Sequence, residues 1–382
     1  MMSDDYRVGL AGKKMSDFQE LIVSRLEDKI ASGAMSAASI RIERRGELEM
    51  EWAGGRRDFD SAAPPVDTES VFNVASITKP MVTSAVATLI ERGLVDADDP
   101  VADYVPEFSA NEKGGVTLRH CLTHTSGLPD MVPGDKELRK RNAPIGDFMD
   151  AACTAQLLFP SGTDVRYQSA GILMLGEIVE RVTDMPLRNY LTEAIFTPTG
   201  MTSTNLGWRE DFESVSVTAN VGNGVFEGGD DATSHWNHNS QYWREFGAPW
   251  GGVHSTAGDV IRLLQLMLND GTSSSGATVF RPHTVRMMLQ DYTMAQPGLS
   301  TAARLLEGWG MGWRIQRTGD GGWYGSGVPA GAFGHAGSTG TVAWADPDSG
   351  VAFTLLTNGL LDVEGGTLKA CGNIAASALC AG

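Results

Sequence analysis

The sequence VFNVASITKPMVTSAVATLIERG, at residues 71–93, decides how this chain folds. Residues 71–75 form a short apolar run that favours an extended strand, and the apolar residues that follow recur at helical spacing. Pro80 is compatible with the first turn of that helix, where the chain has no backbone donor to lose. Ser76 and Lys79 stand between the strand and the helix. The stretch therefore predicts a serine at a strand-to-helix junction, with a lysine one helical turn later.

The spacing of Ser76 and Lys79 has a chemical consequence. Helical positions three apart lie on one face, so the Lys79 amine can reach the Ser76 hydroxyl. Free backbone N–H groups and the positive end of the helix dipole favour a negative charge that develops near the serine. A serine hydroxyl still needs an adjacent base, and an amine is one only if burial or a nearby cation lowers its pKa. The pair predicts acyl transfer through a serine nucleophile.

Five more sequence blocks accompany this pair. In chain order they are GLVD at 93–96 with DDP at 98–100, LTHTSGL at 122–128, Tyr167 with Ser169, GGV at 251–253 with Ser255, Thr256 and Asp259, and GHAGS at 334–338. With these blocks the chain resembles the serine beta-lactamase-fold superfamily from about residue 18 to its C-terminus. The resemblance is to the class C beta-lactamase branch and is closest to the family VIII carboxylesterases. It implies an α/β (α+β) fold like that of penicillin-binding proteins, with an antiparallel sheet flanked by helices and a mainly helical domain.

The resemblance also implies roles for individual residues. Ser76 becomes the nucleophile, Lys79 its proton partner, and Tyr167 a second base that returns the proton to the leaving group. A phenol can take that role if nearby cations depress its pKa. The oxyanion hole is expected from the backbone N–H groups of Ser76 and Ser338, the latter on the strand that carries His335.

Two departures from the class C pattern bear on the substrate. Where class C beta-lactamases carry a lysine in the third motif this chain has His335, and where they have Tyr-x-Asn it has Ser169 two residues after Tyr167. A histidine of ordinary pKa is mostly neutral at pH 7, so it holds a substrate carboxylate poorly. Ser169 lacks the amide that could bind an acyl-side carbonyl, and Gly337 indicates a close approach to this backbone. We therefore expect an uncharged ester substrate.

An aromatic-rich segment at residues 207–250 is the candidate pocket wall. It is rich in Gly, Asn and Asp and contains Trp236, Trp243 and Trp250. Long loops with little regular structure are often lids or pocket walls, and aromatic side chains suit an apolar acyl or alcohol group. The alternative is that these side chains only pack the loop onto the domain.

The overall composition restricts the partners. The chain has 382 residues, is 42% hydrophobic and 20% charged, and can bury a large core. Its formal net charge of −17 argues against binding nucleic acid or anionic lipid surfaces, which need basic patches. The expected partner is a small-molecule ester, with the oligomeric state left open.

Export and membrane signals are not found in the sequence. The N-terminus has no basic segment followed by an apolar core, and no apolar run approaches the roughly 20 residues of a membrane span. We therefore expect a cytoplasmic location. Four scattered cysteines without a C-x-x-C pair predict reduced core residues rather than a disulfide framework.

Two histidine pairs could be read as metal ligands. His120 and His124 have zinc-like spacing but lack the H-E-x-x-H pattern. His235 and His238 lie in the Gly-, Asn- and Trp-rich loop and are better suited to lining a pocket. We predict no metal and no cofactor.

The two ends of the chain are expected to build one domain. A capping box at Ser16 and Gln19 starts an amphipathic helix, and a hairpin turning at Arg45-Gly46 follows it. Strands are expected at 311–315, 340–345 and 351–357. The sequence thus predicts a discontinuous sheet domain at 17–80 and 305–382, whose antiparallel sheet joins both ends, and a mainly helical domain at 81–304.

These observations predict a serine hydrolase that cleaves carboxylic esters through an acyl-enzyme intermediate. Ser76 attacks the ester, the alcohol leaves, and water then deacylates the enzyme. The alternatives on the same fold are a beta-lactamase, a D-amino-acid amidase or peptidase, and a transacylase. A non-catalytic binding or scaffold relative is the non-enzyme alternative. An alpha/beta-hydrolase is excluded because the chain has no G-x-S-x-G.

Overall fold

The computed structural model describes residues 15–220, 237–318, 322–360 and 366–380. The strands are β1 Ala37–Arg44, β2 Glu47–Gly55, β3 Phe72–Asn73, β4 Asn205–Leu206, β5 Val253–Ser255, β6 Gly308–Trp309, β7 Arg314–Ile315, β8 Phe333–Gly337, β9 Thr341–Asp346 and β10 Val351–Thr357. The α-helices are α1 Asp17–Ala31, α2 Thr78–Glu91, α3 Val101–Tyr104, α4 Leu118–Leu122, α5 Asp135–Lys140, α6 Ile145–Thr154, α7 Ala170–Thr183, α8 Leu187–Leu191, α9 Thr197–Thr199, α10 Gln241–Phe246, α11 Ala257–Leu268, α12 Pro282–Leu289, α13 Tyr292–Ala295, α14 Thr301–Leu306 and α15 Thr367–Leu379.

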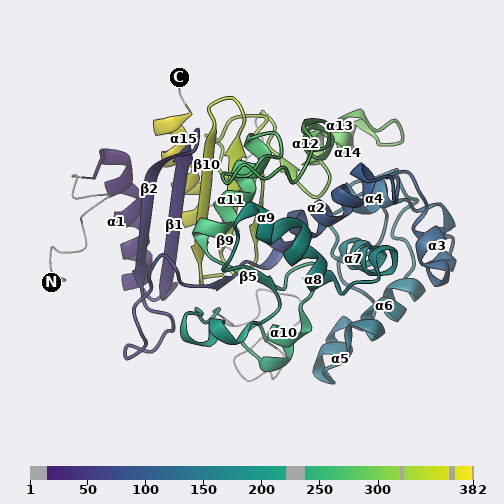
Figure 1. Ribbon diagram of the computed structural model, residues 1–382, viewed down its shortest axis with the longest axis horizontal. Helices are drawn as coiled ribbons and strands as arrows, with labels where there is room; N and C mark the ends of the chain where they lie inside the picture. Colours follow the sequence, from purple (N-terminus) through teal and green to yellow (C-terminus); the bar gives the residue numbers. More distant parts are fainter. Residues whose placement is uncertain (1–14, 221–236, 319–321, 361–365, 381–382) are drawn as a thin grey trace.

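A seven-stranded antiparallel sheet forms the centre of one half of the molecule, in the order β2-β1-β10-β9-β8-β7-β6 (Figure 1). The N-terminal strand β1 pairs with the C-terminal strand β10, with Ile40 opposite Leu355. The hairpin between β1 and β2 turns at Arg45 and Gly46, whose φ angles of 52° and 83° suit a tight two-residue turn. The expectation that both ends of the chain share one antiparallel sheet is confirmed.

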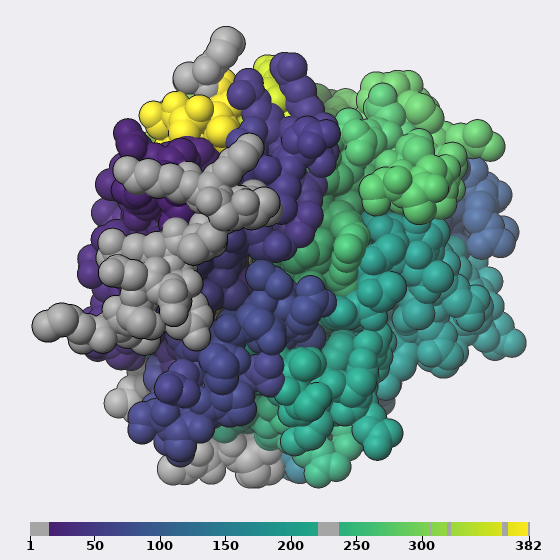
Figure 2. Space-filling view, turned by 60° about the vertical axis from the view of Figure 1, so that its left-hand side comes forward, coloured from purple at the N-terminus to yellow at the C-terminus, as the bar shows by residue number. Residues whose placement is uncertain are grey.

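Helices cover both faces of this sheet. α1 and α15 pack on one face and on each other, and α11 packs on the other face (Figure 1). α1 begins with the predicted capping box of Ser16 and Gln19. The core between the sheet and the α1–α15 pair contains Leu26, Trp344 and Phe353, none of them exposed. In the space-filling view the purple N-terminal and yellow C-terminal parts form one surface (Figure 2).

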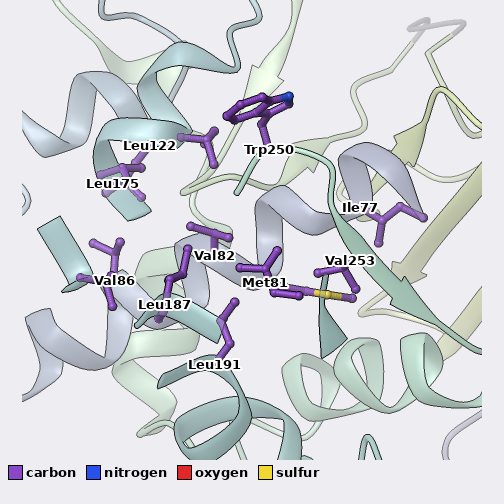
Figure 3. Packing of buried hydrophobic residues seen from close by; sticks show 14 of the residues in the cluster. Ile77, Met81, Val82, Val86, Leu122, Leu175, Leu187, Leu191, Trp250 and Val253 are labelled. Carbon is purple, nitrogen blue, oxygen red and sulfur yellow. The ribbon is translucent and has the colours of Figure 1, made fainter. Parts of the chain in front are cut away.

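The second half of the molecule is mainly helical and is built around α2. Every residue of α2 from Thr78 to Leu89 is buried, and apart from Lys79 its polar residues are small threonines and a serine, which fit inside a core. Val82 and Val86 pack among Leu175 of α7 and Leu187 of α8 (Figure 3). α2 is thus the core helix of this half, and its N-terminus points back toward the large sheet.

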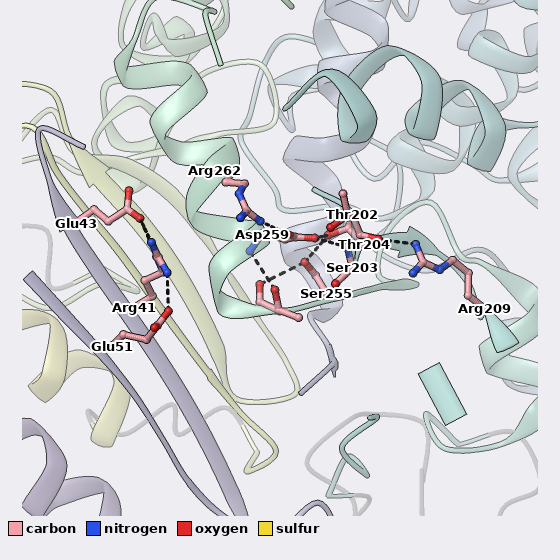
Figure 4. Close-up of polar contacts among 11 residues, drawn as sticks. Arg41, Glu43, Glu51, Thr202, Ser203, Thr204, Arg209, Ser255, Asp259 and Arg262 are labelled. Atoms are coloured by element: carbon pink, nitrogen blue, oxygen red, sulfur yellow. Dashed lines mark hydrogen bonds and ion pairs between the residues drawn. The ribbon is translucent and has the colours of Figure 1, made fainter. Parts of the chain in front are cut away.

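A small three-stranded sheet, β3-β5-β4, joins the two halves. Asp259 of α11 links this sheet to the helix. Its carboxylate accepts hydrogen bonds from Ser203 N at 2.7 Å and Thr204 Oγ1 at 2.9 Å and forms an ion pair with Arg262 (Figure 4). Thr204 also hydrogen-bonds to Ser255 of β5 at 2.7 Å. This network holds β4, β5 and α11 together and so supports β3, the strand that leads to Ser76.

Two expected strands are shorter in the structure. The extended run at 71–75 contributes only the two-residue strand β3, since Ala75 already adopts a left-handed φ of 46°. The strand expected at 311–315 contains only Arg314 and Ile315, because Gly312, at φ 76°, belongs to the turn between β6 and β7. Among the described residues, no helix is both long and apolar enough to cross a lipid bilayer.

Candidate active site

Ser76 lies in a single 3-10 turn, Ala75–Ile77, between β3 and α2. Ala75 holds the left-handed backbone conformation, and its N–H donates to Asn73 Oδ1 at 3.0 Å. Such strained residues need support from their surroundings and are concentrated at functional sites. Here Thr339 Oγ1 donates to Asn73 O at 2.7 Å and Thr341 Oγ1 to Val74 O at 3.0 Å. The β8–β9 region therefore fixes the turn that presents the serine.

Lys79 is completely buried directly beneath the serine. Its Nζ lies 3.1 Å from Ser76 Oγ and donates to the backbone carbonyl of Trp250 at 2.9 Å. Burial lowers the pKa of Lys79 from 10.5 to about 7, although the Asp130 carboxylate acts in the opposite direction. The condition set by the sequence is thus met: a substantial fraction of the amine is neutral near pH 7 and can accept the serine proton.

Tyr167 completes the group, with its ring centre 4.7 Å from Lys79 Nζ. Burial, together with the carboxylates of Asp130 and Glu307, raises its pKa well above 10, while hydrogen bonding with Ser76 opposes the shift. The condition for a second base, a pKa depressed by nearby cations, is therefore not met, because desolvation and negative charge outweigh the hydrogen bond with Ser76. At neutral pH Tyr167 is a phenol with its proton in place.

Hydrogen bonds hold the residues after Tyr167 against the LTHTSGL block at 122–128 and the residues that follow it. Gln168 N donates to His124 Nδ1 at 3.2 Å, and Gln168 Oε1 accepts from Ser126 Oγ at 2.6 Å. The first amides of α7, those of Ser169 and Ala170, both donate to the Asp130 carbonyl at 2.9 Å. The LTHTSGL block is therefore a scaffold that positions the tyrosine, and this function was not visible in the sequence.

An aromatic wall surrounds the phenol. The ring of His124 lies 4.9 Å from that of Tyr167 and 4.2 Å from that of Trp309. Trp323 meets the Tyr167 ring edge-on at 5.7 Å and lies 5.0 Å from the ring of His335. Neither tryptophan was among the expected site residues, because the sequence around each carries no motif. Their packing accounts for the low polarity next to the reacting groups.

His335 lies on β8 and faces this wall rather than solvent. Its Nδ1 is 2.7 Å from its neighbour's carbonyl, Ala336 O, and the side chain is 1% exposed. Burial, followed by the charge of Lys79, lowers the pKa of His335 to about 3. The histidine is therefore neutral throughout the physiological range, and it supplies no fixed positive charge in the third motif.

Gly337 and Ser338 lie beside the nucleophile turn. A Cβ added to Gly337 would be 2.3 Å from Val74 O and 3.1 Å from the Ala75 Cβ. The close approach expected from this glycine is therefore present, and the approaching group is the turn itself. Ser338 is the first residue after β8 rather than a residue of a strand, which places its backbone next to that turn.

A narrow depression that is too small for a water molecule lies beside Ser169 and Trp250. Apolar side chains such as Phe148 and Leu173 line it, and Asp130 is among the residues around it. Ser169 and Trp250, both expected in the pocket, thus border one space, and the Trp250 carbonyl also binds Lys79.

The other two expected tryptophans are not part of this depression. Trp243 is 3% exposed, packs within the core, and carries Arg139 over its ring at 4.9 Å. For Trp243 the alternative of loop packing is the one that the structure shows. Trp236, like His235, lies outside the described residues.

The His120 and His124 side chains are each engaged in other contacts. His120 Nδ1 accepts from Thr117 N at 3.1 Å, and His124 Nδ1 accepts from Gln168 N. In the described part of the chain no group of three or more His, Cys, Asp or Glu side chains could hold a metal ion. Sequence reasoning missed the Trp250 carbonyl and Asp130 because a backbone acceptor has no sequence signature and Asp130 precedes Tyr167 by 37 positions (167 − 130).

Comparison with known proteins identifies the family of the chain. Residues 20–370 match the family described as Beta-lactamase. Penicillin-binding protein 4 of Amycolatopsis lactamdurans is 30% identical over 309 residues, 77% of this chain and 74% of that protein.

Solved structures show the same fold. EstCE1, described as a hydrolase with promiscuous acyltransferase activity, has a TM-score of 0.75 at 20% identity and covers 93% of this chain and 98% of its own. A family VIII carboxylesterase has a TM-score of 0.74 at 20% identity, with 95% and 98% covered. The chain therefore belongs to the Beta-lactamase family and has the serine beta-lactamase fold of its hydrolases.

Proposed function

We propose that this protein is a carboxylesterase that works through an acyl-enzyme on Ser76. Neutral Lys79 takes the Ser76 proton while the oxygen attacks the ester carbonyl, which gives a tetrahedral oxyanion. The backbone N–H groups of Ser76 and Ser338 are the proposed donors to that oxyanion, each worth about 3 kcal/mol in comparable enzymes. The role of each residue rests on its position next to the serine.

Tyr167 is proposed to deliver the proton to the departing alcohol. The raised pKa means that the phenol starts protonated, so it can donate to the alkoxide and recover a proton from the Lys79 ammonium. Deacylation runs the same route in reverse, with water in place of the alcohol. Lys79 is then the base of the resting enzyme, and Tyr167 is a proton carrier rather than a second base.

The observation that favours an ester over a beta-lactam or a D-alanyl peptide is the neutral His335. Those substrates carry a carboxylate, which a fixed cation in the third motif could hold. With a pKa of about 3, His335 gives no such cation. An uncharged ester loses nothing by this, whereas an anionic substrate loses an ion pair.

Initial rates on three chromogenic substrates test the proposal. We would compare a short p-nitrophenyl ester, a cephalosporin and a D-alanyl p-nitroanilide, using wild type and Ser76→Ala. We expect the ester to have the highest kcat/KM and the variant to lose at least about 10³-fold. Activity of Ser76→Ala equal to wild type would refute the nucleophile.

The same panel separates the rival functions. Faster turnover of the cephalosporin would identify a beta-lactamase, and faster turnover of the anilide would identify a D-amino-acid amidase or peptidase. Adding a second alcohol and following the transfer product would identify a transacylase. A folded protein inactive on all three, and on transfer, would support the non-catalytic alternative.

A further inference from the structure

We propose that Trp323 is the surface on which this enzyme holds the alcohol part of its ester, and that the site therefore prefers esters of aromatic or bulky apolar alcohols. The inference rests on the proposed esterase function and names a substrate class within it. Trp323 is a specificity residue in this proposal: it touches the alcohol group and takes no part in the bond changes. The reaction itself remains the hydrolysis described above.

The leaving oxygen of the ester has to lie beside Tyr167. In the proposed mechanism the phenol delivers a proton to the departing alcohol, and that transfer requires hydrogen-bond distance between the two oxygens. The carbon skeleton of the alcohol extends from the leaving oxygen, so it lies against the solvent-facing neighbours of Tyr167. The ester carbon carries its acyl and alkoxy groups in different directions, so the acyl part meets other residues.

Trp323 is the neighbouring ring that a substrate can reach. Among the described residues, the rings of His124, Trp309, Trp323 and His335 have centres 4.9–6.0 Å from that of Tyr167. The side chains of His124 and Trp309 are 0% exposed and that of His335 is 1% exposed. Trp323 and Tyr167 are both partly exposed, and Trp323 meets the phenol edge-on at 5.7 Å. An alcohol group bonded to the leaving oxygen thus has the indole as its aromatic contact.

The surroundings of Trp323 are apolar and hold it in place. Trp323 and Tyr167 pack together against a small buried cluster, whose members are Val165, Leu299, Ala303 and Trp309. The ring of Trp323 lies 5.6 Å from that of Trp309 and 5.0 Å from that of His335. A flat apolar surface that is already fixed needs little ordering when a ligand binds to it.

The charged groups next to this wall are bound to other parts of the protein. Glu307 accepts a hydrogen bond from Trp309 Nε1 at 2.9 Å. Arg314 is 3% exposed, and its guanidinium lies 5.9 Å from the centre of the Trp323 ring and donates to the carbonyl of Gly308 at 3.2 Å. The part of the wall that faces solvent is therefore an uncharged ring, which suits an apolar alcohol.

Matched esters separate the alcohol side from the acyl side. The alcohol pair is phenethyl butanoate and ethyl butanoate, and the acyl pair is ethyl 4-phenylbutanoate and ethyl butanoate. In both pairs methylene groups separate the phenyl group from the ester, so the intrinsic reactivity of the ester bond changes little. For each pair the measured quantity is the ratio of kcat/KM for the phenyl-bearing ester to that for ethyl butanoate.

The ratios are compared in wild type and in three variants of Trp323. Trp323→Ala removes the surface, Trp323→Phe keeps a ring, and Trp323→Leu removes the ring while filling much of its space. Trp323→Leu carries the test if Trp323→Ala does not fold, which circular dichroism shows. Trp52→Ala, which removes a partly exposed tryptophan of β2, is the matched control.

We expect a wild-type alcohol ratio above one and a drop of roughly 10-fold in Trp323→Ala, the discrimination that loss of an apolar contact gives. Trp323→Leu should lower the ratio by at least about 3-fold because it has no ring face, and Trp323→Phe should keep most of it. The acyl ratio should change by less than about 2-fold in every variant. Trp52→Ala should leave both ratios unchanged.

Three results would overturn the inference. They are a wild-type alcohol ratio at or below one, an alcohol ratio that the folded Ala and Leu variants do not lower, and an acyl ratio that falls more than the alcohol ratio. Hydrolysis of ethyl butanoate that is lost in Ser76→Ala keeps the esterase function in each case. Absence of any ester hydrolysis by wild type would instead refute the proposed function, so the two failures are distinguishable.

Discussion

The reactivity of the site depends on a single residue whose charge state is set by burial. Lys79 has a pKa of about 7, and its neutral form is the proposed base. We therefore predict that kcat/KM for a neutral ester rises with pH through a midpoint near 7 and levels off above it. Asp130 favours the ammonium form, so Asp130→Asn should move this midpoint to lower pH. A pH-rate profile from about pH 5 to 9 measures both. A flat profile over that range would contradict the assignment of Lys79 as base.

Burying this lysine should also reduce stability. The amine has a pKa of 10.5 when exposed and about 7 in the folded protein, so between these values the unfolded chain binds more protons. Stability should therefore rise with pH over that interval, and the cost of Lys79 should be complete below pH 7. Lys79→Met removes the cost. We predict that its advantage over wild type in the free energy of unfolding is largest below pH 7 and shrinks by up to about 1.4 kcal/mol per pH unit above it, with a parallel change in the Tm difference.

Thermal unfolding of both proteins at several pH values provides the measurement. Lys136→Met, which removes an exposed lysine of α5, controls for the loss of one positive charge. A Tm difference for Lys79→Met that stays constant between neutral and alkaline pH would show that the amine is not desolvated in the folded protein. Lys79→Met should be inactive at every pH.

His335 is the proposed determinant of substrate choice. Replacing it with lysine adds a cation to the third motif, and we predict that His335→Lys raises the ratio of cephalosporin to ester turnover by about tenfold, the effect of one favourable ion pair near 1.4 kcal/mol. His335→Gln is the matched variant, because it changes the side chain without adding charge. Equal ratios in the two variants would mean that a cation at this position does not govern the choice.

At the scale of elements, the nucleophile turn depends on its contact with the end of β8. Gly337→Ala would place a Cβ 2.3 Å from both Val74 O and Thr341 Oγ1, so the strand or the turn must move. We predict a loss of about 1–3 kcal/mol of stability and at least a tenfold loss of kcat, because Ser76 is two residues from Val74. Gly114→Ala, where nothing lies within 4 Å of the added Cβ, is the control. Unchanged kcat in folded Gly337→Ala would show that the turn tolerates displacement.

Elements with strong local patterns could be predicted from the sequence. α2 begins where the apolar spacing after Ser76 predicts a helix, and the β1–β2 hairpin turns at the predicted Arg45-Gly46. α15 was missed, although its apolar spacing could have indicated it. Its burial depends on α1 and β10, which are far away in the sequence.

The chemistry of the site could be predicted only where it is local. The Ser76 and Lys79 pair follows from a spacing of three. The raised pKa of Tyr167 could not be predicted, because it arises from burial and from Asp130 and Glu307, which come from separate segments. The same applies to the Trp250 carbonyl that binds Lys79.

At the scale of the whole molecule, the reacting groups lie where the two halves meet. Ser76 and Lys79 come from the start of α2, the central helix of one half, whereas His335 and Gly337 come from β8 of the large sheet. The small sheet that joins the halves is fastened by the buried Asp259. The geometry of the site therefore depends on the whole fold, since moving either half would separate the nucleophile turn from β8.

The net charge of the molecule is the last property with a measurable effect. A chain with a formal charge of −17 attracts cations and repels anions over a distance set by the Debye length, about 30 Å at 0.01 M salt and about 8 Å at 0.15 M. Raising the salt concentration across this range should raise the Tm by weakening self-repulsion. It should also lower kcat/KM for a cationic ester while leaving a neutral isostere nearly unchanged. An equal decrease for both esters would instead indicate that salt acts on the enzyme and not on the approach of the substrate.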